Sequence, residues 1–140
     1  MTVRADDQIP EWVMPSVSAD RMKTMAALLR DPNPLHWDRN AVAALPMNLG
    51  QRTINQGPLG LSYIVNMIHG WMGPGTLKKL YMTFPQVVLD NDRVVARGVV
   101  TEMAGSIAIC DVWLEHAERG RLLEGTAHVE TGQHAESTQA

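Results

Sequence analysis

The segment that most constrains the fold is an apolar helix whose predicted start is Gly57. Glycine can serve as a helix cap and proline suits the first helical position, so Gly57-Pro58 is a favourable opening. The helix is predicted to run to His69, and apolar residues cover most of its circumference. A helix this apolar belongs inside a domain. The rest of the chain must therefore enclose it.

After Thr76 the apolar pattern changes from helical spacing to the alternation of β-strands, with turn residues between the runs. Four strands are predicted, over residues 77–84, 94–103, 108–115 and 123–130. The fourth has small residues on its inner face, which leaves room for a helix to lie against the sheet. The sequence therefore predicts an α+β fold in which an antiparallel sheet wraps around one central buried helix. Open sheet edges also predict pairing with a second subunit.

Two shorter helices are predicted before the apolar one. Ser18 is a good N-cap for a helix over about residues 19–30. A second helix is expected over residues 41–45, where apolar residues recur at helical spacing. Residues 51–56 then form a polar connector to the apolar helix.

The length of 140 residues suits one domain, which can bury a sizeable core without metal or disulfide staples. We expect a single domain over residues 11–130. Residues 1–10 are predicted to be loose and residues 131–140 to form a disordered polar tail.

Composition and charge exclude several classes of function. A net charge of -3 leaves no basic field for nucleic acid, and no segment is apolar enough to span a membrane. The acidic start lacks the pattern of a signal peptide, and the lone Cys110 is predicted to be a buried small hydrophobe. A chain with one cysteine forms no internal disulfide, so a cytoplasmic location is expected. His116 and His128 lack partners at metal-ligand spacing, so no metal is expected.

Between the two short helices lies a polar loop that combines two carboxylates, an amide and an imidazole with two prolines. Its sequence over residues 31–38 is Asp-Pro-Asn-Pro-Leu-His-Trp-Asp. Proline disfavours helix for the residue before it, so Asp31 and Asn33 are displayed on a stiffened turn. His36 is the one side chain of the loop that titrates near neutral pH. Such residues are also common in surface turns, so the composition of the loop alone favours a surface turn over an active-site loop.

The order and spacing of the loop decide between them. The pattern Asp-x-Asn-Pro-(aliphatic)-His-x-Asp, followed by a glycine that opens an apolar helix, resembles the signature of the MaoC-like hydratases and dehydratases. That family comprises the (R)-specific enoyl-thioester hydratases of the hot-dog fold. Every fixed position is present, and the resemblance covers residues 18–70 closely. It implies a hot-dog fold and a hydro-lyase that reversibly hydrates trans-2-enoyl thioesters to (R)-3-hydroxyacyl thioesters.

The resemblance also implies a set of catalytic residues. In the family, an aspartate and a histidine of the motif bind and activate one water, and the motif asparagine helps to hold the site. Carried over to this chain, these are Asp31, His36 and Asn33. A backbone amide at the glycine that corresponds to Gly57 donates to the thioester oxygen. Asp38 is predicted to cap the short helix that follows.

The start of the apolar helix suits an oxyanion, because its first amides lack intrahelical partners and the helix dipole favours negative charge. Pro58 has no N–H, which leaves Gly57 and Leu59 as available donors. Several positions depart from the common family pattern, among them Pro58, which stands where methionine is frequent. Gln56 stands where histidine is frequent, and a Pro-Gly-Asp turn is replaced by Asp-Asn-Asp at residues 90–92, an exchange of turn chemistry.

The resemblance leaves several alternatives open. The substrate is expected to be an acyl-CoA or acyl-carrier-protein thioester, with no further cofactor. The assembly is expected to be a homodimer or a heterodimer with another hot-dog subunit. The same fold also hosts thioesterases, and the motif could persist as structure in a non-catalytic subunit of a heteromeric dehydratase. Acyl chain length, direction and pathway are not determined by the sequence.

Overall fold

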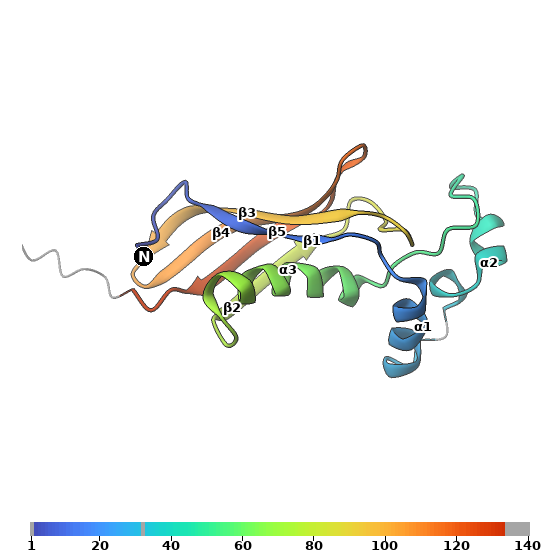
Figure 1. Ribbon diagram of the computed structural model, residues 1–140, viewed down its shortest axis with the longest axis horizontal. Coiled ribbons are helices and arrows are strands. Elements are labelled where there is room, and N and C mark those ends of the chain that lie inside the picture. Colours follow the sequence, from blue (N-terminus) through green and yellow to red (C-terminus); the bar gives the residue numbers. More distant parts are fainter. Residues whose placement is uncertain (1, 32, 134–140) are drawn as a thin grey trace, which may run out of the picture.

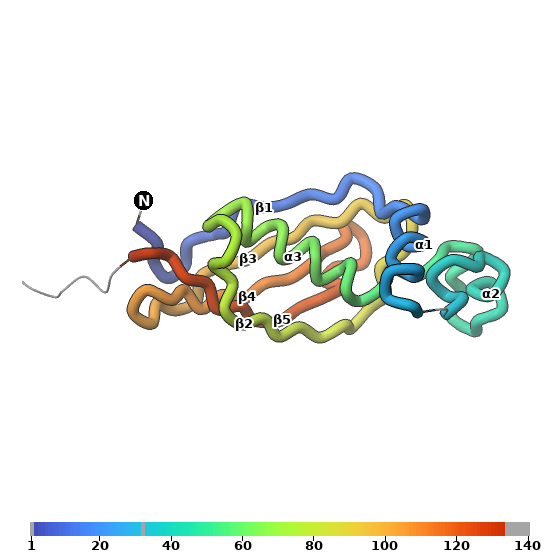
Figure 2. The backbone as a smooth tube through the Cα atoms, turned by 90° about the horizontal axis from the view of Figure 1, so that it is seen from below, coloured from blue at the N-terminus to red at the C-terminus, as the bar shows by residue number. Residues whose placement is uncertain are grey.

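The computed structural model describes residues 2–31 and 33–133 of the protein. Its elements, in chain order, are β1 (Gln8–Met14), α1 (Ala19–Leu28), a single 3-10 turn (Pro34–His36), α2 (Arg39–Ala43), α3 (Gly57–Met72), β2 (Leu77–Thr83), β3 (Val94–Ala104), β4 (Ile107–His116) and β5 (Gly120–Glu130). The five strands form one antiparallel sheet in the order β1-β3-β4-β5-β2. Helix α3 lies along one face of this sheet, and α1 and α2 lie together at one end of the molecule (Figures 1 and 2). The predicted sheet around a buried helix is confirmed.

The core forms where α3 meets the inner face of the sheet. Ile64 and Ile68 of α3 are fully buried, and the strands present their inward residues to them. The buried residues of β4 are those that the alternation placed inside: Ala108, Cys110, Val112 and Leu114. Each large apolar side chain removed from water contributes roughly 1.5–3 kcal/mol. Burial of this one helix face therefore holds the sheet and α3 together.

The observed helices differ from the predicted ones mainly at their ends. Ser18 caps α1 through its side chain, as expected, but the helix ends earlier because Arg30 takes a left-handed conformation with φ 51°. Helix α3 continues three residues beyond His69 to Met72 and is closed by Gly73 at φ 92°. Within residues 2–31 and 33–133, none of the helices combines the length and the apolar character that a membrane crossing requires.

Residues 2–10, which the sequence predicts to be loose, make specific contacts with the sheet and with the other end of the described chain. Val3 is buried, and its backbone N–H donates to Gln133 Oε1 at 2.8 Å. Further along, the Asp6 amide donates to the Val100 carbonyl at 2.7 Å. The tail begins in the same ordered layer, because the Thr131 amide donates to the Ser106 carbonyl at 3.0 Å. Residues 134–140 of the predicted disordered tail lie outside the described part of the chain.

Three polar residues of the predicted polar connector over residues 51–56 are buried, whereas Gln51 is exposed. Thr53, Asn55 and Gln56 are only 2%, 7% and 2% exposed. On one side the Ile54 amide donates to the Leu35 carbonyl at 2.8 Å, and on the other the Asn55 amide donates to Val88 at 2.7 Å. The connector therefore joins the polar loop of residues 31–38 to the chain at 88–90.

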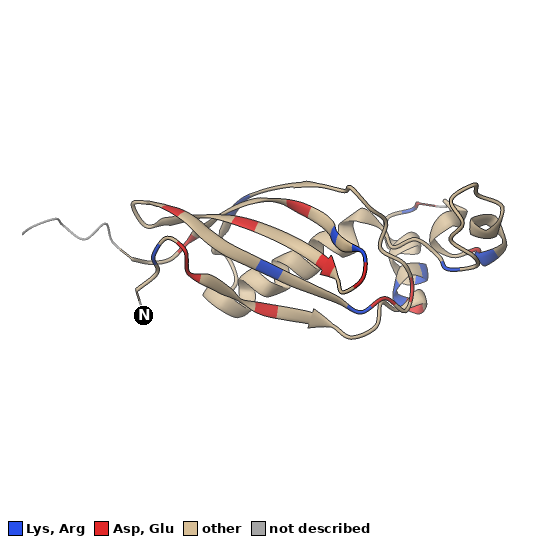
Figure 3. Ribbon diagram, turned by 90° about the horizontal axis from the view of Figure 1, so that it is seen from above, with Lys and Arg blue, Asp and Glu red and all other residues tan. Residues whose placement is uncertain are grey.

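The turn at residues 90–92 anchors this end of the molecule, rather than simply reversing the chain. Asp90 is fully buried; its Oδ2 accepts from the Thr53 amide at 2.9 Å and pairs with Arg39 at 3.0 Å. Asp92 is also buried and pairs with Arg52 at 2.6 Å and with Arg119. Elsewhere, acidic and basic residues are interspersed over the outer face of the sheet (Figure 3). The two buried aspartates hold the connector and the α2 region against the sheet.

Candidate active site

The structure brings Asp31 and His36 together. Nε2 of His36 lies 3.5 Å from Oδ2 of Asp31, and the Asp31 side chain is 42% exposed whereas that of His36 is 13% exposed. Asp31 follows the end of α1, and His36 ends the 3-10 turn. The pair thus joins a largely buried imidazole to a carboxylate that solvent or a ligand can reach.

The protonation of His36 is constrained by its second nitrogen. Nδ1 lies 2.7 Å from the carbonyl oxygen of Ile54, which can only accept a hydrogen bond. In the neutral ring the proton therefore resides on Nδ1, and Nε2 carries the lone pair. Nε2 and the Asp31 carboxylate then present two acceptors to the same small volume. Such a pair can hold a donor with two protons, such as water, and can receive one of those protons.

The remaining polar residues of the loop shape it. The Asn33 side chain accepts from the Leu35 amide at 3.1 Å and caps the 3-10 turn, while the Asn33 amide donates to Asp31 Oδ1 at 3.2 Å. Asp38 accepts from the Asn40 amide at 3.0 Å, which confirms its predicted role as the cap of α2. Asn33 therefore orients the carboxylate of Asp31 through its backbone.

Gly57 begins α3 and lacks a side-chain cap from Gln56. Of the two donors considered from the sequence, Leu59 is already occupied, since its amide donates to the Gln56 carbonyl at 3.1 Å. Gly57 is the donor that remains, at the positive end of the helix dipole. A Cβ on Gly57 would lie 3.5 Å from the ring of Phe84, so an aromatic side chain covers this helix start.

Three of the predicted residues, Asp31, His36 and Gly57, each line a different hollow. Asp31 lines an open cleft of about 520 Å³ with Lys23, Arg30 and Trp37. His36 lines a second, of about 380 Å³, which shares Lys23 and Trp37 with the first. Gly57 lines a third, of about 250 Å³.

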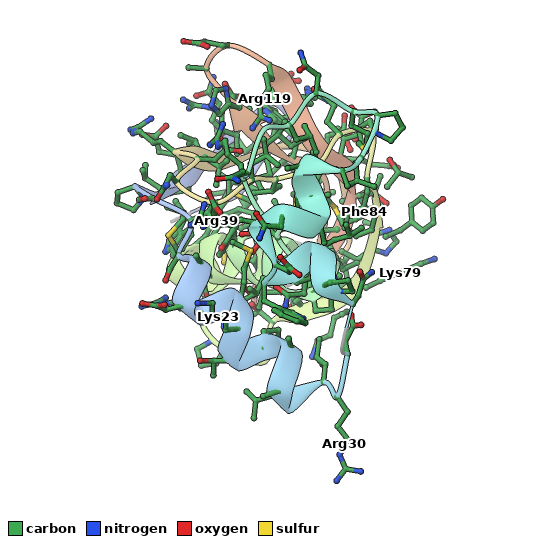
Figure 4. All side chains as sticks on the ribbon, turned by 90° about the vertical axis from the view of Figure 1, so that its right-hand side faces the viewer. Lys23, Arg30, Arg39, Lys79, Phe84 and Arg119 are labelled. Carbon is green, nitrogen blue, oxygen red and sulfur yellow. The ribbon has the colours of Figure 1, made fainter. Side chains whose placement is uncertain are left out.

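Residues 54–57 connect these hollows, because Ile54 binds His36 and also borders the Gly57 cavity. Figure 4 looks onto this end of the molecule, with Arg30 extending away from its body. The structure thus brings Asp31 and His36 to 3.5 Å from each other and places Gly57 in a separate cavity, which residues 54–57 link to His36 through the backbone.

Several residues of this region were not anticipated from the sequence. Ile54 orients the imidazole through a backbone carbonyl, which no sequence pattern can indicate. Asn55 and Gln56 are buried beside Gly57, and Asn55 Nδ2 and Oδ1 and Gln56 Oε1 lack hydrogen-bond partners. An unsatisfied buried polar group costs about 1–3 kcal/mol. The sequence signal for these two residues was a pair of adjacent side-chain amides directly before Gly57, but such a pair is also typical of a solvent-exposed linker.

Cys110 is buried, as predicted, and takes no part in this region. Burial raises the pKa of its thiol to about 11, and Asp111 adds to that effect. The thiol is therefore neutral near pH 7 and unsuited to act as a nucleophile.

An antiparallel sheet wrapped around one central helix defines the hot-dog class of folds, and solved structures of that class superpose on the chain. The R-hydratase PhaJ1 from Pseudomonas aeruginosa does so with a TM-score of 0.81 at 19% identity, covering 94% of this chain and 83% of that one. The (R)-hydratase from A. caviae involved in PHA biosynthesis gives 0.80 at 22% identity, covering 92% and 97%. The ChsH1-ChsH2 complex from Mycobacterium tuberculosis gives 0.78 at 18% identity, covering 94% and 99%.

These likenesses establish the fold, and a family match adds to them. The MaoC like domain family matches residues 7–114. The chain therefore belongs to the MaoC-like dehydratase family. No curated protein matches the sequence significantly.

Proposed function

We propose that the protein is a hydro-lyase that reversibly adds water to a trans-2-enoyl thioester and forms the (R)-3-hydroxyacyl thioester. The observation that carries the proposal is the pair of acceptors formed by Asp31 and His36, 3.5 Å apart, with the imidazole held by Ile54. The neighbouring solved structures named as (R)-hydratases and the family of the chain support the same chemistry.

In the hydration direction, the water bound between Asp31 and His36 attacks C3 of the enoyl thioester. Nε2 of His36 accepts one water proton as the oxygen–carbon bond forms, and the Asp31 carboxylate stabilises the resulting imidazolium. The electron pair of the C2–C3 double bond moves onto the thioester oxygen. The imidazolium then returns its proton to C2, so that the elements of one water are added and His36 is restored.

The thioester oxygen becomes negative during this sequence and needs a donor already in place. The Gly57 amide is assigned that role, because it begins α3 without a side-chain cap and the helix dipole favours an anion there. Asn33 keeps the loop in shape by capping the 3-10 turn. Pro58 cannot donate, so removal of this interaction requires a change in the backbone at Gly57 itself.

The substrate carrier belongs to the same proposal. Lys23 and Arg30 border the cleft beside Asp31 and bring positive charge to its mouth. This suits a carrier that bears phosphate, as coenzyme A and the acyl-carrier prosthetic group do. We place the reaction in the cytoplasm and in a dimer of hot-dog subunits, in line with the neighbour solved as a complex of two proteins.

The test is a hydration assay with purified protein and a series of trans-2-enoyl-CoA thioesters, followed by loss of the conjugated enoyl absorbance. Chiral analysis of the product should give the (R)-3-hydroxyacyl thioester. Release of free thiol, measured in the same reaction, would instead indicate a thioesterase. Absence of any hydration, with Asp31→Asn identical to the wild type in every activity found, would overturn the proposal.

The possibility of a non-catalytic subunit is tested by native mass and activity, measured for the protein alone and after coexpression with the products of neighbouring genes. Activity of the isolated protein supports the proposal. Activity that appears only in a mixed complex, and that survives Asp31→Asn in this chain, would assign catalysis to the other subunit.

A further inference from the structure

Two backbone hydrogen bonds fasten the connector to the segment that precedes β3. The Asp90 amide donates to the Thr53 carbonyl at 2.9 Å, and the Asn55 amide donates to the Val88 carbonyl at 2.7 Å. Ile54 lies between these two bonds and turns its own amide and carbonyl toward the polar loop. The position of the Ile54 carbonyl, which receives the imidazole, is therefore set by the segment before β3.

The fully buried carboxylate of Asp90 reinforces this attachment. Its Oδ2 accepts from the Thr53 amide at 2.9 Å and from the Thr53 hydroxyl at 2.7 Å, and it pairs with Arg39 at 3.0 Å. Arg39 also donates to the Gln51 carbonyl at 3.0 Å. The Asp90 backbone is held in turn, because Arg52 donates to its carbonyl at 2.7 Å. One buried oxygen thus gathers three donors at the point where the connector approaches the polar loop.

Two acceptors compete for the single proton of the neutral His36 ring. The Ile54 carbonyl oxygen lies 2.7 Å from Nδ1, whereas Oδ2 of Asp31 lies 3.5 Å from Nε2. The shorter contact keeps the proton on Nδ1. If the Ile54 carbonyl moved away from the ring, the proton would transfer to Nε2 and bond to Asp31. The ring would then present no lone pair to the water and would not act as its base.

We propose that Asp90 is a positioning residue for His36. By holding Thr53, it keeps the Ile54 carbonyl at the distance that leaves Nε2 unprotonated. The inference rests on the proposed function, because it concerns the base of that reaction. A buried ion pair contributes little net stability, so a carboxylate at this point is better explained by the geometry that it imposes. Asp90 acts through Thr53 and Ile54 and not by touching the substrate.

The tautomer of His36 tests the proposal without any substrate. Nitrogen NMR shifts of isotopically labelled protein distinguish the two neutral forms of the ring, and His36→Gln identifies the signals that belong to this histidine. Asp90→Ala should lower the ratio of the Nδ1-protonated to the Nε2-protonated form by about tenfold, the effect of weakening one hydrogen bond. An unchanged ratio in folded Asp90→Ala would overturn the proposal.

Hydration kinetics give the second readout. Asp90→Ala should lower kcat by roughly 10- to 100-fold, the scale of a misplaced catalytic group. KM should stay within about threefold of the wild type, because the groups that bind the thioester are unchanged. Asp90→Asn retains an oxygen that can accept from Thr53, so it should recover most of kcat and the wild-type tautomer. Equal losses in the two variants, or a loss of kcat without a change of tautomer, would overturn the proposal.

Thr53→Val covers the case in which Asp90→Ala does not fold. It removes only the hydroxyl bond to Asp90, so both readouts should shift in the same direction by less, and Thr53→Ser should reverse the shifts. Absence of any shift in Thr53→Val would then overturn the proposal.

Val100→Ala is the control for a general loss of stability. Val100 is fully buried in β3, and its backbone bonds to Asp6 and Asp7 and not to the connector. Truncation of a core side chain should destabilise the protein but leave the tautomer of His36 and kcat at wild-type values. The same response in Val100→Ala as in Asp90→Ala would overturn the positioning role.

The two readouts separate this inference from the proposed function. Hydration by the wild type, with an unchanged His36 tautomer in Asp90→Ala, would retain the hydro-lyase and overturn the positioning role. A tautomer that changes in Asp90→Ala and recovers in Asp90→Asn would support the positioning role even if no enoyl thioester is hydrated.

Discussion

Nδ1 of His36 lies 2.7 Å from the carbonyl oxygen of Ile54, and in the reverse direction the Ile54 amide donates to Leu35 at 2.8 Å. One residue of the buried connector therefore holds both the backbone of the polar loop and the ring of its histidine. Because a carbonyl only accepts, the imidazole keeps Nε2 free of a proton in its neutral form. Ile54, 18 positions away in the chain, therefore orients His36 so that its unprotonated Nε2 faces Asp31.

Asp31→Asn should lower kcat for hydration by about 100- to 10,000-fold, the range attributed to a positioned acid or base. The amide retains the shape of the side chain but no longer stabilises an imidazolium at Nε2. Thermal stability should change little, because Asp31 is partly exposed and exposed ion pairs contribute little. Asp111→Asn, on the exposed face of β4, is the control and should keep wild-type kcat.

Thr53→Val should destabilise the protein by about 1–3 kcal/mol, because it leaves the buried carboxylate of Asp90 with one donor fewer. The lost bond, from Thr53 Oγ1 to Asp90 Oδ2, is 2.7 Å long. Chemical denaturation would measure the change, and Thr126→Val on the exposed face of β5 should stay within about 0.5 kcal/mol of the wild type. Equal effects of the two substitutions would show that the buried anchor adds no stability.

Gly125→Ala should be severely destabilising, by about 3 kcal/mol or more, because the added Cβ would lie 1.8 Å from the Tyr81 carbonyl oxygen. Strand β2 pairs with β5 here, and its backbone lies too close to Gly125 for any side chain. Gly70→Ala is the contrasting change, since nothing lies within 4 Å of a Cβ there. It should stabilise α3 by about 0.5–1 kcal/mol. Thermal unfolding of both variants would reveal the opposite signs.

The buried thiol of Cys110 should resist thiol reagents at pH 8 in the native protein and react fully in denaturant. Its folded pKa of about 11 exceeds the ordinary value of 9.0, so the folded state retains a proton that the unfolded chain releases. Stability from this group is therefore complete below pH 9 and is lost as the pH rises toward 11, by roughly 2–3 kcal/mol at most. Cys110→Ala should show a flatter decline over that interval, whatever its absolute stability. An identical decline in both proteins would contradict this assignment.

The pattern of the strands was accessible from the sequence because each has one buried and one exposed face. The alternation around Cys110 identified the inner residues of β4, and small residues such as Ala127 marked the place where α3 packs. The caps Ser18 and Asp38 could also be predicted, because a cap bonds to a backbone amide within three residues of itself. Periodicity could not reveal that Val3 and Gln133 meet, because that bond joins opposite ends of the described chain.

By itself the sequence determined a sheet around one apolar helix and a loop rich in acid, amide and imidazole groups. Both are local properties, set by the spacing of apolar residues and by the prolines of the loop. Only the tertiary structure decided that Asp31 and His36 face each other, that Leu59 is occupied and that Asn55 is buried beside Gly57. These depend on which backbone carbonyls and cavities lie nearby. Residues 53–56 have the composition of a polar linker, but in the structure they lie between the loop of residues 31–38 and the start of α3, with Thr53, Asn55 and Gln56 buried.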